Sequence, residues 1–282
     1  MKRQQGFTLV ELIIVIVLTG IIGGVLTMMV VPAIQSYLAV SQRAALTNLA
    51  DTALRTVAVD VRRAVPNSLR LGDAQCLELV PTIDGGRFRS APDAERPGAA
   101  YINEAEPGDA FDVLTPFTGA PKVGDVIVVG NRSQNDIYGQ TNVAVINGIG
   151  APPDPKLGQA RVRLDRQFQI PQGYDGARFA VVAAERQIVT YRCTAGLDAK
   201  TGSGSGTLVR LNGNSLGAAP ACNGPVPAGA ALVASHVESC NFVFYANAGA
   251  TQDSGFVQMQ LTLTNKGQSV PLTVGAHVSN VP

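Results

Sequence analysis

The chain has 282 residues, of which 46% are hydrophobic and 15% are charged, with a formal net charge of +1 at pH 7. The hydrophobic fraction excludes wholesale disorder, and the length allows one large domain or two small ones. A near-neutral charge, with no basic cluster beyond the pair Arg62-Arg63, excludes a protein that binds nucleic acid through its phosphates. The 30 glycines and 17 prolines indicate many turns, which favours a β-rich body.

The first six residues form a short polar segment with Lys2 and Arg3, and the chain then becomes strongly apolar. Between Leu12 and Val31 there are 20 residues without a charge. A helix of that length is about 30 Å long, which is the thickness of the apolar core of a bilayer. The two basic residues should hold the start of the chain in the cytoplasm, which places the rest beyond the inner membrane in the periplasm.

Two common kinds of apolar N-terminal segment fit poorly. A cleaved secretory signal peptide has a shorter apolar stretch followed by a polar region with a cleavage site, and no polar region follows Gly23-Gly24. A plain membrane anchor fits the length but leaves Glu11 unexplained. A carboxylate costs up to about 2.5–3.5 kcal/mol at the centre of a membrane helix and less near its end, so Glu11 indicates a function.

The basic leader and the apolar span meet in the string GFTLVE, residues 6–11. This junction resembles the class III signal of type IV prepilins and pseudopilins. The resemblance implies that a prepilin peptidase removes residues 1–6 by cutting between Gly6 and Phe7, and that Phe7 becomes the N-methylated first residue. It also implies that Glu11, one helical turn after Phe7, pairs with the terminal ammonium of a neighbouring subunit.

The same resemblance implies the partners and the location of the chain. The partners would be prepilin peptidase, membrane lipid, other minor and major pilins bound through the N-terminal helix, and an inner-membrane assembly platform. The chain would cross the inner membrane once, with its head in the periplasm, and then enter a pilus or pseudopilus, at the tip. We expect no nucleic acid, no cofactor and no enzymatic activity.

The helical pattern continues past Pro32, a residue that kinks or breaks helices. Pro66-Asn67 provides a clear stop, so a helix is expected over residues 7–65, with 7–31 in the membrane and 32–65 amphipathic. Asp51 and Arg55 are spaced as a favourable i,i+4 ion pair. The expected buried stripe recurs at three, four or seven residues and consists of Leu38, Ala45, Leu49, Ala53, Val57, Val61 and Ala64.

From residue 66 to 282 the pattern changes to short apolar or alternating runs separated by turns, which predicts a β-rich, pilin-like head and an α+β fold overall. Strands are expected at residues 76–80, 125–129, 143–146, 160–164, 178–183, 187–193, 207–211, 240–245, 255–264 and 269–278. Turns are expected at 84–86, which reads Asp-Gly-Gly, at 202–206 and at 265–268. Residues 90–112 and 148–158 are expected to be irregular loops.

The four cysteines, Cys76, Cys193, Cys222 and Cys240, all lie in the head. In an oxidising periplasm they should form two disulfides, with three possible connectivities. We favour Cys76–Cys193 with Cys222–Cys240, because the second pair would staple a short segment rich in Gly, Pro and Ala.

The spacing of these cysteines does not resemble a metal site, and no metal is expected. The two histidines, His236 and His277, are interpreted as ordinary strand or loop residues. Four carboxylates gather in one loop and could suggest calcium, but they match no known calcium pattern and are interpreted as a solvated acidic loop. They are Glu104, Glu106, Asp109 and Asp112.

The chain is larger than a usual major pilin, which favours a minor pilin or pseudopilin that primes or caps a fibre. Residues 189–193 (VTYRC), 206–210 (GTLVR) and 277–282 (HVSNVP) resemble the O-type minor pilins of mannose-sensitive haemagglutinin pilus biogenesis. Two alternatives remain open: a J-type pseudopilin of a type II secretion system, and a pilus-tip adhesin.

Overall fold

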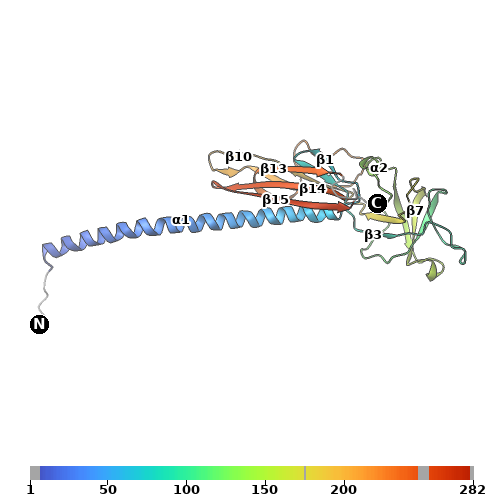
Figure 1. Ribbon diagram of the computed structural model, residues 1–282, viewed down its shortest axis with the longest axis horizontal. Coiled ribbons are helices and arrows are strands. Elements are labelled where there is room, and N and C mark those ends of the chain that lie inside the picture. Colours follow the sequence, from blue (N-terminus) through green and yellow to red (C-terminus); the bar gives the residue numbers. More distant parts are fainter. Residues whose placement is uncertain (1–6, 175, 247–253, 280–282) are drawn as a thin grey trace, which may run out of the picture.

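The computed structural model describes residues 7–174, 176–246 and 254–279. A single long helix, α1 (Leu9–Arg62), projects from a β-rich head, so the predicted α+β class is confirmed (Figure 1). The N-terminal half of α1 stands clear of the head, and its C-terminal half packs along it.

The head contains fifteen strands in the described residues, a short α-helix and one 3₁₀ turn. Their bounds are β1 (Arg70–Asp73), β2 (Cys76–Leu79), β3 (Asp84–Arg87), β4 (Gly108–Val113), β5 (Val126–Val129), α2 (Gln134–Tyr138), β6 (Val143–Gly150), η1 (Pro155–Leu157), β7 (Ala160–Phe168), β8 (Arg178–Val182), β9 (Ile188–Cys193), β10 (Leu197–Asp198), β11 (Ser203–Gly204), β12 (Gly206–Gly213), β13 (Ala231–Tyr245), β14 (Ser254–Asn265) and β15 (Gln268–Ser279).

The larger sheet, here called the main sheet, is antiparallel and has the order β1-β2-β9-β12-β13-β14-β15. Its longest hairpin joins β14 to β15 through Lys266 and Gly267, which have φ values of 49° and 75°. Positive φ at both central residues is the geometry of a two-residue hairpin turn whose twist matches that of the strands. The turn predicted at residues 265–268 is therefore confirmed.

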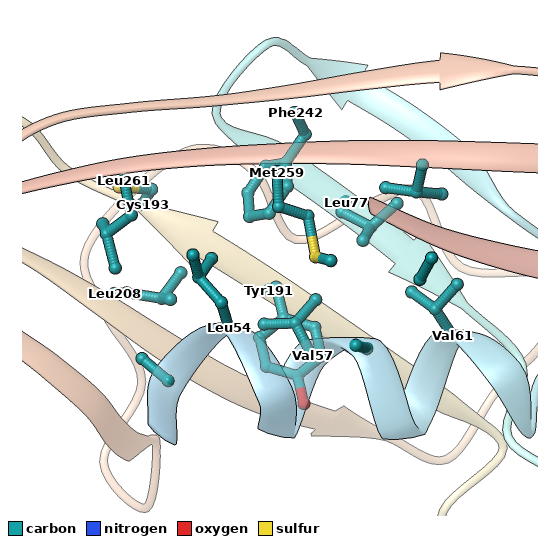
Figure 2. Close-up of a cluster of buried hydrophobic side chains, with 14 of the residues drawn as sticks. Leu54, Val57, Val61, Leu77, Tyr191, Cys193, Leu208, Phe242, Met259 and Leu261 are labelled. Carbon is teal, nitrogen blue, oxygen red and sulfur yellow. The ribbon is translucent and has the colours of Figure 1, made fainter. Parts of the chain in front are cut away.

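One face of the main sheet packs against the C-terminal half of α1 and forms the largest core. Leu54, Val57 and Val61 of the helix point toward Tyr191 and Met259 on the strands (Figure 2). All five side chains are at most 1% exposed. Fully burying side chains of this size stabilises by about 1.5–3 kcal/mol each, so this layer holds the helix on the head.

The second sheet has the order β3-β8-β5-β6-β7-β4 and lies between β2 and β9 in the sequence. An antiparallel bridge between Phe88 and Val113 connects its two outer strands, β3 and β4, so the sheet closes on itself. Phe88, Phe111 and Phe179 fill its interior with edge-to-face contacts of 5.7 and 5.3 Å between ring centroids. We call residues 80–187 the inserted barrel.

The insertion starts and ends at adjacent points of the main sheet, because Leu79 at the end of β2 pairs with Val189 of β9. Insertions are well tolerated where the two ends of the inserted segment lie close together. The barrel sits at the end of the head that is far from the exposed half of α1 (Figure 1).

Apolar packing and side-chain hydrogen bonds fix the barrel against the main sheet. Val65, Val126 and Ile188 belong to one shared cluster of buried residues. The Asn131 side chain donates to the Pro66 carbonyl at 2.6 Å, and the Tyr138 hydroxyl donates to the Ser68 carbonyl at 2.8 Å. These bonds connect the barrel to the segment that directly follows α1.

The predicted turn at residues 84–86 is wrong, because these residues form β3 and pair with β8. Neither Gly85 nor Gly86 has a positive φ. A β-carbon on Gly85 would lie 2.7 Å from the carbonyl oxygen of Phe179. The glycines therefore allow a close approach of two strands, which is the other common reason for glycine in a strand.

Three predicted loops and turns were too long, because each of them contains part of a strand. The expected loop over residues 90–112 contains most of β4, and the expected loop over 148–158 contains the last residues of β6. The expected turn at 202–206 contains β11, which pairs with β10. Strands rich in glycine and polar residues give little signal in the sequence because partner strands, and not their own side chains, stabilise them.

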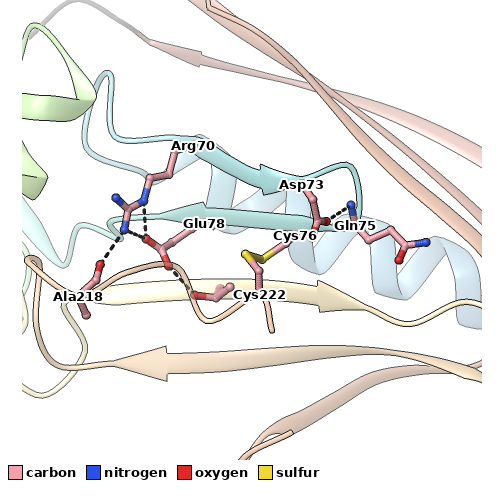
Figure 3. Close-up of a disulfide and its surroundings, with 8 residues drawn as sticks. Arg70, Asp73, Gln75, Cys76, Glu78, Ala218 and Cys222 are labelled. Atoms are coloured by element: carbon pink, nitrogen blue, oxygen red, sulfur yellow. Dashed lines mark hydrogen bonds and ion pairs between the residues drawn. A yellow bond between two sulfur atoms is a disulfide. The ribbon is translucent and has the colours of Figure 1, made fainter. Parts of the chain in front are cut away.

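All four cysteines form disulfides, but the favoured pairing is wrong. The bonds are Cys193–Cys240 and Cys76–Cys222, the second of which is shown in Figure 3. Cys76 pairs in register with Arg192, so Cys76 and Cys193 face opposite sides of the sheet and cannot meet. Cys240 lies nine residues into strand β13, about 30 Å from its start, which carries it away from Cys222.

Gly72 provides a test of this connectivity. A β-carbon at Gly72 would lie 2.1 Å from the sulfur of Cys222, whereas one at Gly150 meets nothing within 4 Å. We expect Gly72→Ala to lower the free energy of unfolding by about 1–3 kcal/mol through overpacking. Gly150→Ala, also in a strand, should change it by less than about 0.5 kcal/mol. Thermal unfolding in detergent measures both variants, and equal stabilities would contradict the Cys76–Cys222 contact.

Candidate functional site

The candidate site is the N-terminal half of α1, which exposes a long and largely apolar surface. Its large apolar side chains are between 44% and 82% exposed from Phe7 to Val40, and the first buried residue of the helix is Leu46. It is the one helix in the described residues that is long and apolar enough to cross a membrane. Such a surface is unstable in water and requires lipid or apolar protein around it.

Two threonine hydroxyls within this segment are satisfied inside the helix. The Thr19 hydroxyl donates to the Val15 carbonyl at 2.7 Å, and the Thr27 hydroxyl donates to the Gly23 carbonyl at 2.8 Å. Pro32 lies within the helix and does not end it. This half of α1 therefore suits a bilayer, where unsatisfied polar groups are costly.

Thr8 and Glu11 organise the first turn. Thr8 is the N-cap, and its hydroxyl accepts a hydrogen bond from the Glu11 backbone N–H at 3.3 Å. The spacing Thr-x-x-Glu is that of a capping box, in which the glutamate would also accept from the N-cap N–H. Within the described residues the Glu11 carboxylate has no hydrogen-bond or ion-pair partner, so its charge remains available to another chain.

The predicted cleavage junction lies partly outside the described residues, which begin at Phe7. Phe7 precedes the helix and is 82% exposed, and Glu11 lies in its first turn. Phe7 and Glu11 therefore both lie at the start of α1, which is the end of the apolar segment that is far from the head (Figure 1).

The C-terminal half of α1 orients the segment relative to the head. The predicted stripe is correct at Ala53, Val57, Val61 and Ala64, which are buried. It is wrong at Leu38, which is 52% exposed, and at Ala45. Burial against the head begins at Leu46, about two turns after Leu38, and Leu46 and Ala50 take the buried positions there.

A polar contact at Asp60 complements this apolar packing. The Tyr191 hydroxyl donates to the Asp60 carboxylate at 2.7 Å, and the Arg210 guanidinium pairs with it at 2.8 Å. About two turns earlier in the helix, Asp51 and Arg55 form the expected ion pair at 2.6 Å. Asp60 therefore ties the last turns of α1 to strands β9 and β12.

The other candidate residues do not form a catalytic or metal site. His236 has a φ of 59° at an irregularity in the pairing of β13, and His277 packs on the Phe256 ring at 4.9 Å. Asp112 is fully buried and pairs with Arg161 at 2.7 Å. Across the part of the chain that the structure describes, no group of three or more His, Cys, Asp or Glu side chains could hold a metal ion.

The other members of the acidic cluster are dispersed. The Glu104 carboxylate accepts a hydrogen bond from the Gly173 N–H, and the Glu106 carboxylate accepts one from the Tyr101 hydroxyl at 3.2 Å. Asp109 lies exposed in β4.

Comparison with known proteins matches one family, described as the prokaryotic N-terminal methylation motif, over residues 1–27. No solved structure matches the chain. The motif supports a type IV pilin-like or pseudopilin-like protein, a structural and non-enzymatic class. Together with the exposed apolar helix, it indicates anchoring in a membrane. The match ends at residue 27, so it covers no residue of the two disulfides or of the two sheets.

The Asp60 contact predicts how the stability of the head depends on pH. Burial, and then the hydrogen bond and the negative charge of Asp60, raise the pKa of Tyr191 above its ordinary value. The unfolded chain loses this proton first, near pH 10, so the folded state should lose stability as the pH rises above about 10. Tyr191→Phe should make that loss shallower. Tyr245→Phe, at a half-exposed position, should not, and equal slopes for the three proteins would contradict the assignment.

Proposed function

We propose that this chain is a minor pilin or pseudopilin that primes or caps assembly of a type IV pilus of the mannose-sensitive haemagglutinin type. The observation that carries the proposal is an N-terminal methylation motif at the start of a helix whose first half is largely apolar and exposed. In this proposal prepilin peptidase cuts between Gly6 and Phe7, and Phe7 is then N-methylated.

The apolar half of α1 supports an assembly step in which the helix exchanges lipid neighbours for protein neighbours. It would lie in the inner membrane first, with the head in the periplasm, and an assembly platform would then transfer it to a fibre of packed pilin helices. Because lipid tails and packed apolar helices both surround this surface with apolar groups, the transfer exposes little of it to water. The free energy of the transfer therefore depends strongly on the few polar groups in the segment.

Glu11 is the charged group among them. Its carboxylate is exposed and lacks a partner within the described part of its own chain. Removal of the leader would create a terminal ammonium at Phe7, and a neighbouring subunit could bring that ammonium to Glu11. Two opposite charges in an apolar environment stabilise each other and offset part of the cost of removing each from water.

The shape of the head supports a position at the tip of the fibre. The inserted barrel extends the head at the end far from the apolar half of α1 (Figure 1). At the tip no further subunit lies above the head, so the added bulk would meet no neighbour there. The same placement favours a second candidate, a tip adhesin whose barrel contacts a surface. A J-type pseudopilin of a type II secretion system would use the same N-terminal half.

Replacing Glu11 tests the proposed assembly role. Glu11→Gln keeps the size of the side chain and removes the charge. We expect normal leader removal and membrane insertion but at least a tenfold lower amount of this chain in sheared fibres, since about 1.4 kcal/mol of lost pairing corresponds to a factor of ten.

Asp51→Asn is the matched control, because Asp51 is an exposed carboxylate on the same helix. It should leave the amount in fibres unchanged. Immunoblots of membrane and fibre fractions measure both variants. Wild-type incorporation of the Glu11→Gln chain would contradict the role of this carboxylate.

A further inference from the structure

Two turns lie together at the end of the head that faces the exposed half of α1 (Figure 1). One connects β10 to β11, and the other connects β14 to β15. The Gly267 N–H donates to the Gly202 carbonyl at 2.7 Å, and the Lys266 N–H donates to the Ser203 hydroxyl at 3.0 Å. These bonds hold the two turns as one unit, here called the proximal rim, which comprises residues 197–203 and 265–268.

The proximal rim lies level with the point where the apolar surface of α1 ends. The Arg43 guanidinium donates to the side chain of Gln268 at 2.7 Å. Arg43 is the first charged residue after Glu11, and the apolar run ends three residues earlier, at Val40, which is 63% exposed. The apolar surface of the helix therefore ends at the level of the rim, where the cationic side chains begin.

The two ammonium groups of the rim have no ion-pair partner among the described residues, whereas its one carboxylate, Asp198, is charged and hydrogen-bonded within its own turn. Lys200 and Lys266, which carry the two ammonium groups, are exposed. The Asp198 carboxylate accepts hydrogen bonds from the Lys200 N–H at 2.8 Å and from the Thr201 hydroxyl at 3.1 Å.

A second carboxylate, that of Glu238, lies near the rim and is half-buried. Glu238 accepts hydrogen bonds from the Thr264 and Ser269 hydroxyls. An apolar side chain, Leu197, is 54% exposed on the same rim. Arg43, Lys200 and Lys266 outnumber Asp198 and Glu238 on this surface, which therefore carries an excess of positive charge beside an apolar side chain.

The length of the helix brings this surface to the membrane. From Leu9 to Arg43 the helix rises about 51 Å, or about 48 Å along the membrane normal at a typical tilt of about 20°. A bilayer with its headgroups is about 40–45 Å thick. If Leu9 lies at the outer face of the cytoplasmic headgroups, Arg43 and the rim lie about 3–8 Å beyond the headgroups of the other leaflet, a distance that extended lysine side chains can bridge.

We propose that Arg43, Lys200 and Lys266 bind the phosphate groups of anionic phospholipids in the leaflet on the side of the head. The proposal rests on the membrane-anchored state of the proposed function and not on its fibre-assembly role. Because both lysines belong to turns of the main sheet, and not to α1, these contacts fix how the head is seated and rotated about the helix axis. The chain would release them when it leaves the membrane.

The five lysines of the chain allow a test with internal controls. The full chain is placed in vesicles of phosphatidylcholine, with or without phosphatidylglycerol, and an uncharged amine-reactive reagent labels its lysines for mass spectrometry. We expect Lys200 and Lys266 to react about fivefold more slowly in the anionic vesicles, as one favourable contact per lysine implies. Lys122 and Lys156, which are exposed on the inserted barrel, should react equally in both.

Salt and charge variants separate the remaining explanations. The protection should disappear at about 1 M salt, where surface charges are screened. Lys266→Gln should reduce the protection of Lys200, and Lys156→Gln should not. Equal labelling in the two kinds of vesicle would overturn the proposal. Protection that follows the protein-to-lipid ratio and not the lipid charge would also overturn it, because a second copy of the chain would then cover the rim. None of these results depends on fibre assembly, so Glu11→Gln tests the proposed function separately.

Discussion

The structure depends on how one helix divides its apolar surface between the head and its surroundings. From Leu46 to Val61 the apolar side of α1 is buried against the main sheet, and the burial of these side chains holds the helix at a fixed angle. From Phe7 to Val40 the helix buries no large apolar side chain in its own chain. The N-terminal half can therefore be stable only in a membrane or among other apolar helices, and the C-terminal half fixes where the head then lies.

Glu11 gains its importance from this division. In water an exposed carboxylate in the first turn of a helix would be unremarkable, since it is favoured by the helix dipole and fits the Thr8 capping box. In an apolar environment the same charge needs a partner, and the structure shows the Thr8 half of the capping box without the Glu11 half. A cap of the helix and a charge available between chains are compatible roles for one side chain.

Local sequence patterns predicted the helix and most strands, because hydrophobic periodicity and turn residues act over short distances. The turn at residues 265–268 and the stop after α1 are of this kind. The disulfide pairing depends on which face of which strand carries each cysteine, and Cys76 and Cys193 differ in face although their strands are neighbours. Gly85 and Gly86 led to the wrong prediction of a turn, because glycine is favoured both in tight turns and where two strands approach each other closely.

The closed barrel between β2 and β9 could not be predicted for a related reason. Its strands are about as short as β1, β2, β9 and β12 of the main sheet, and what sets them apart is the pairing in the order β3-β8-β5-β6-β7-β4 and the bridge from Phe88 to Val113. These contacts join residues that are far apart in sequence. The consequence for function is that the head carries a second rigid unit at its far end, while its near end carries the cationic rim.

The most direct test of the central claim is mass spectrometry of the N-terminal peptide from the chain isolated from the membranes of cells that produce it. The account predicts that the peptide begins with N-methylated Phe7 and that residues 1–6 are missing. A peptide that begins at Met1, or one that begins beyond Gly24, would contradict the account, because the apolar half of α1 would then carry an uncleaved leader or would be lost.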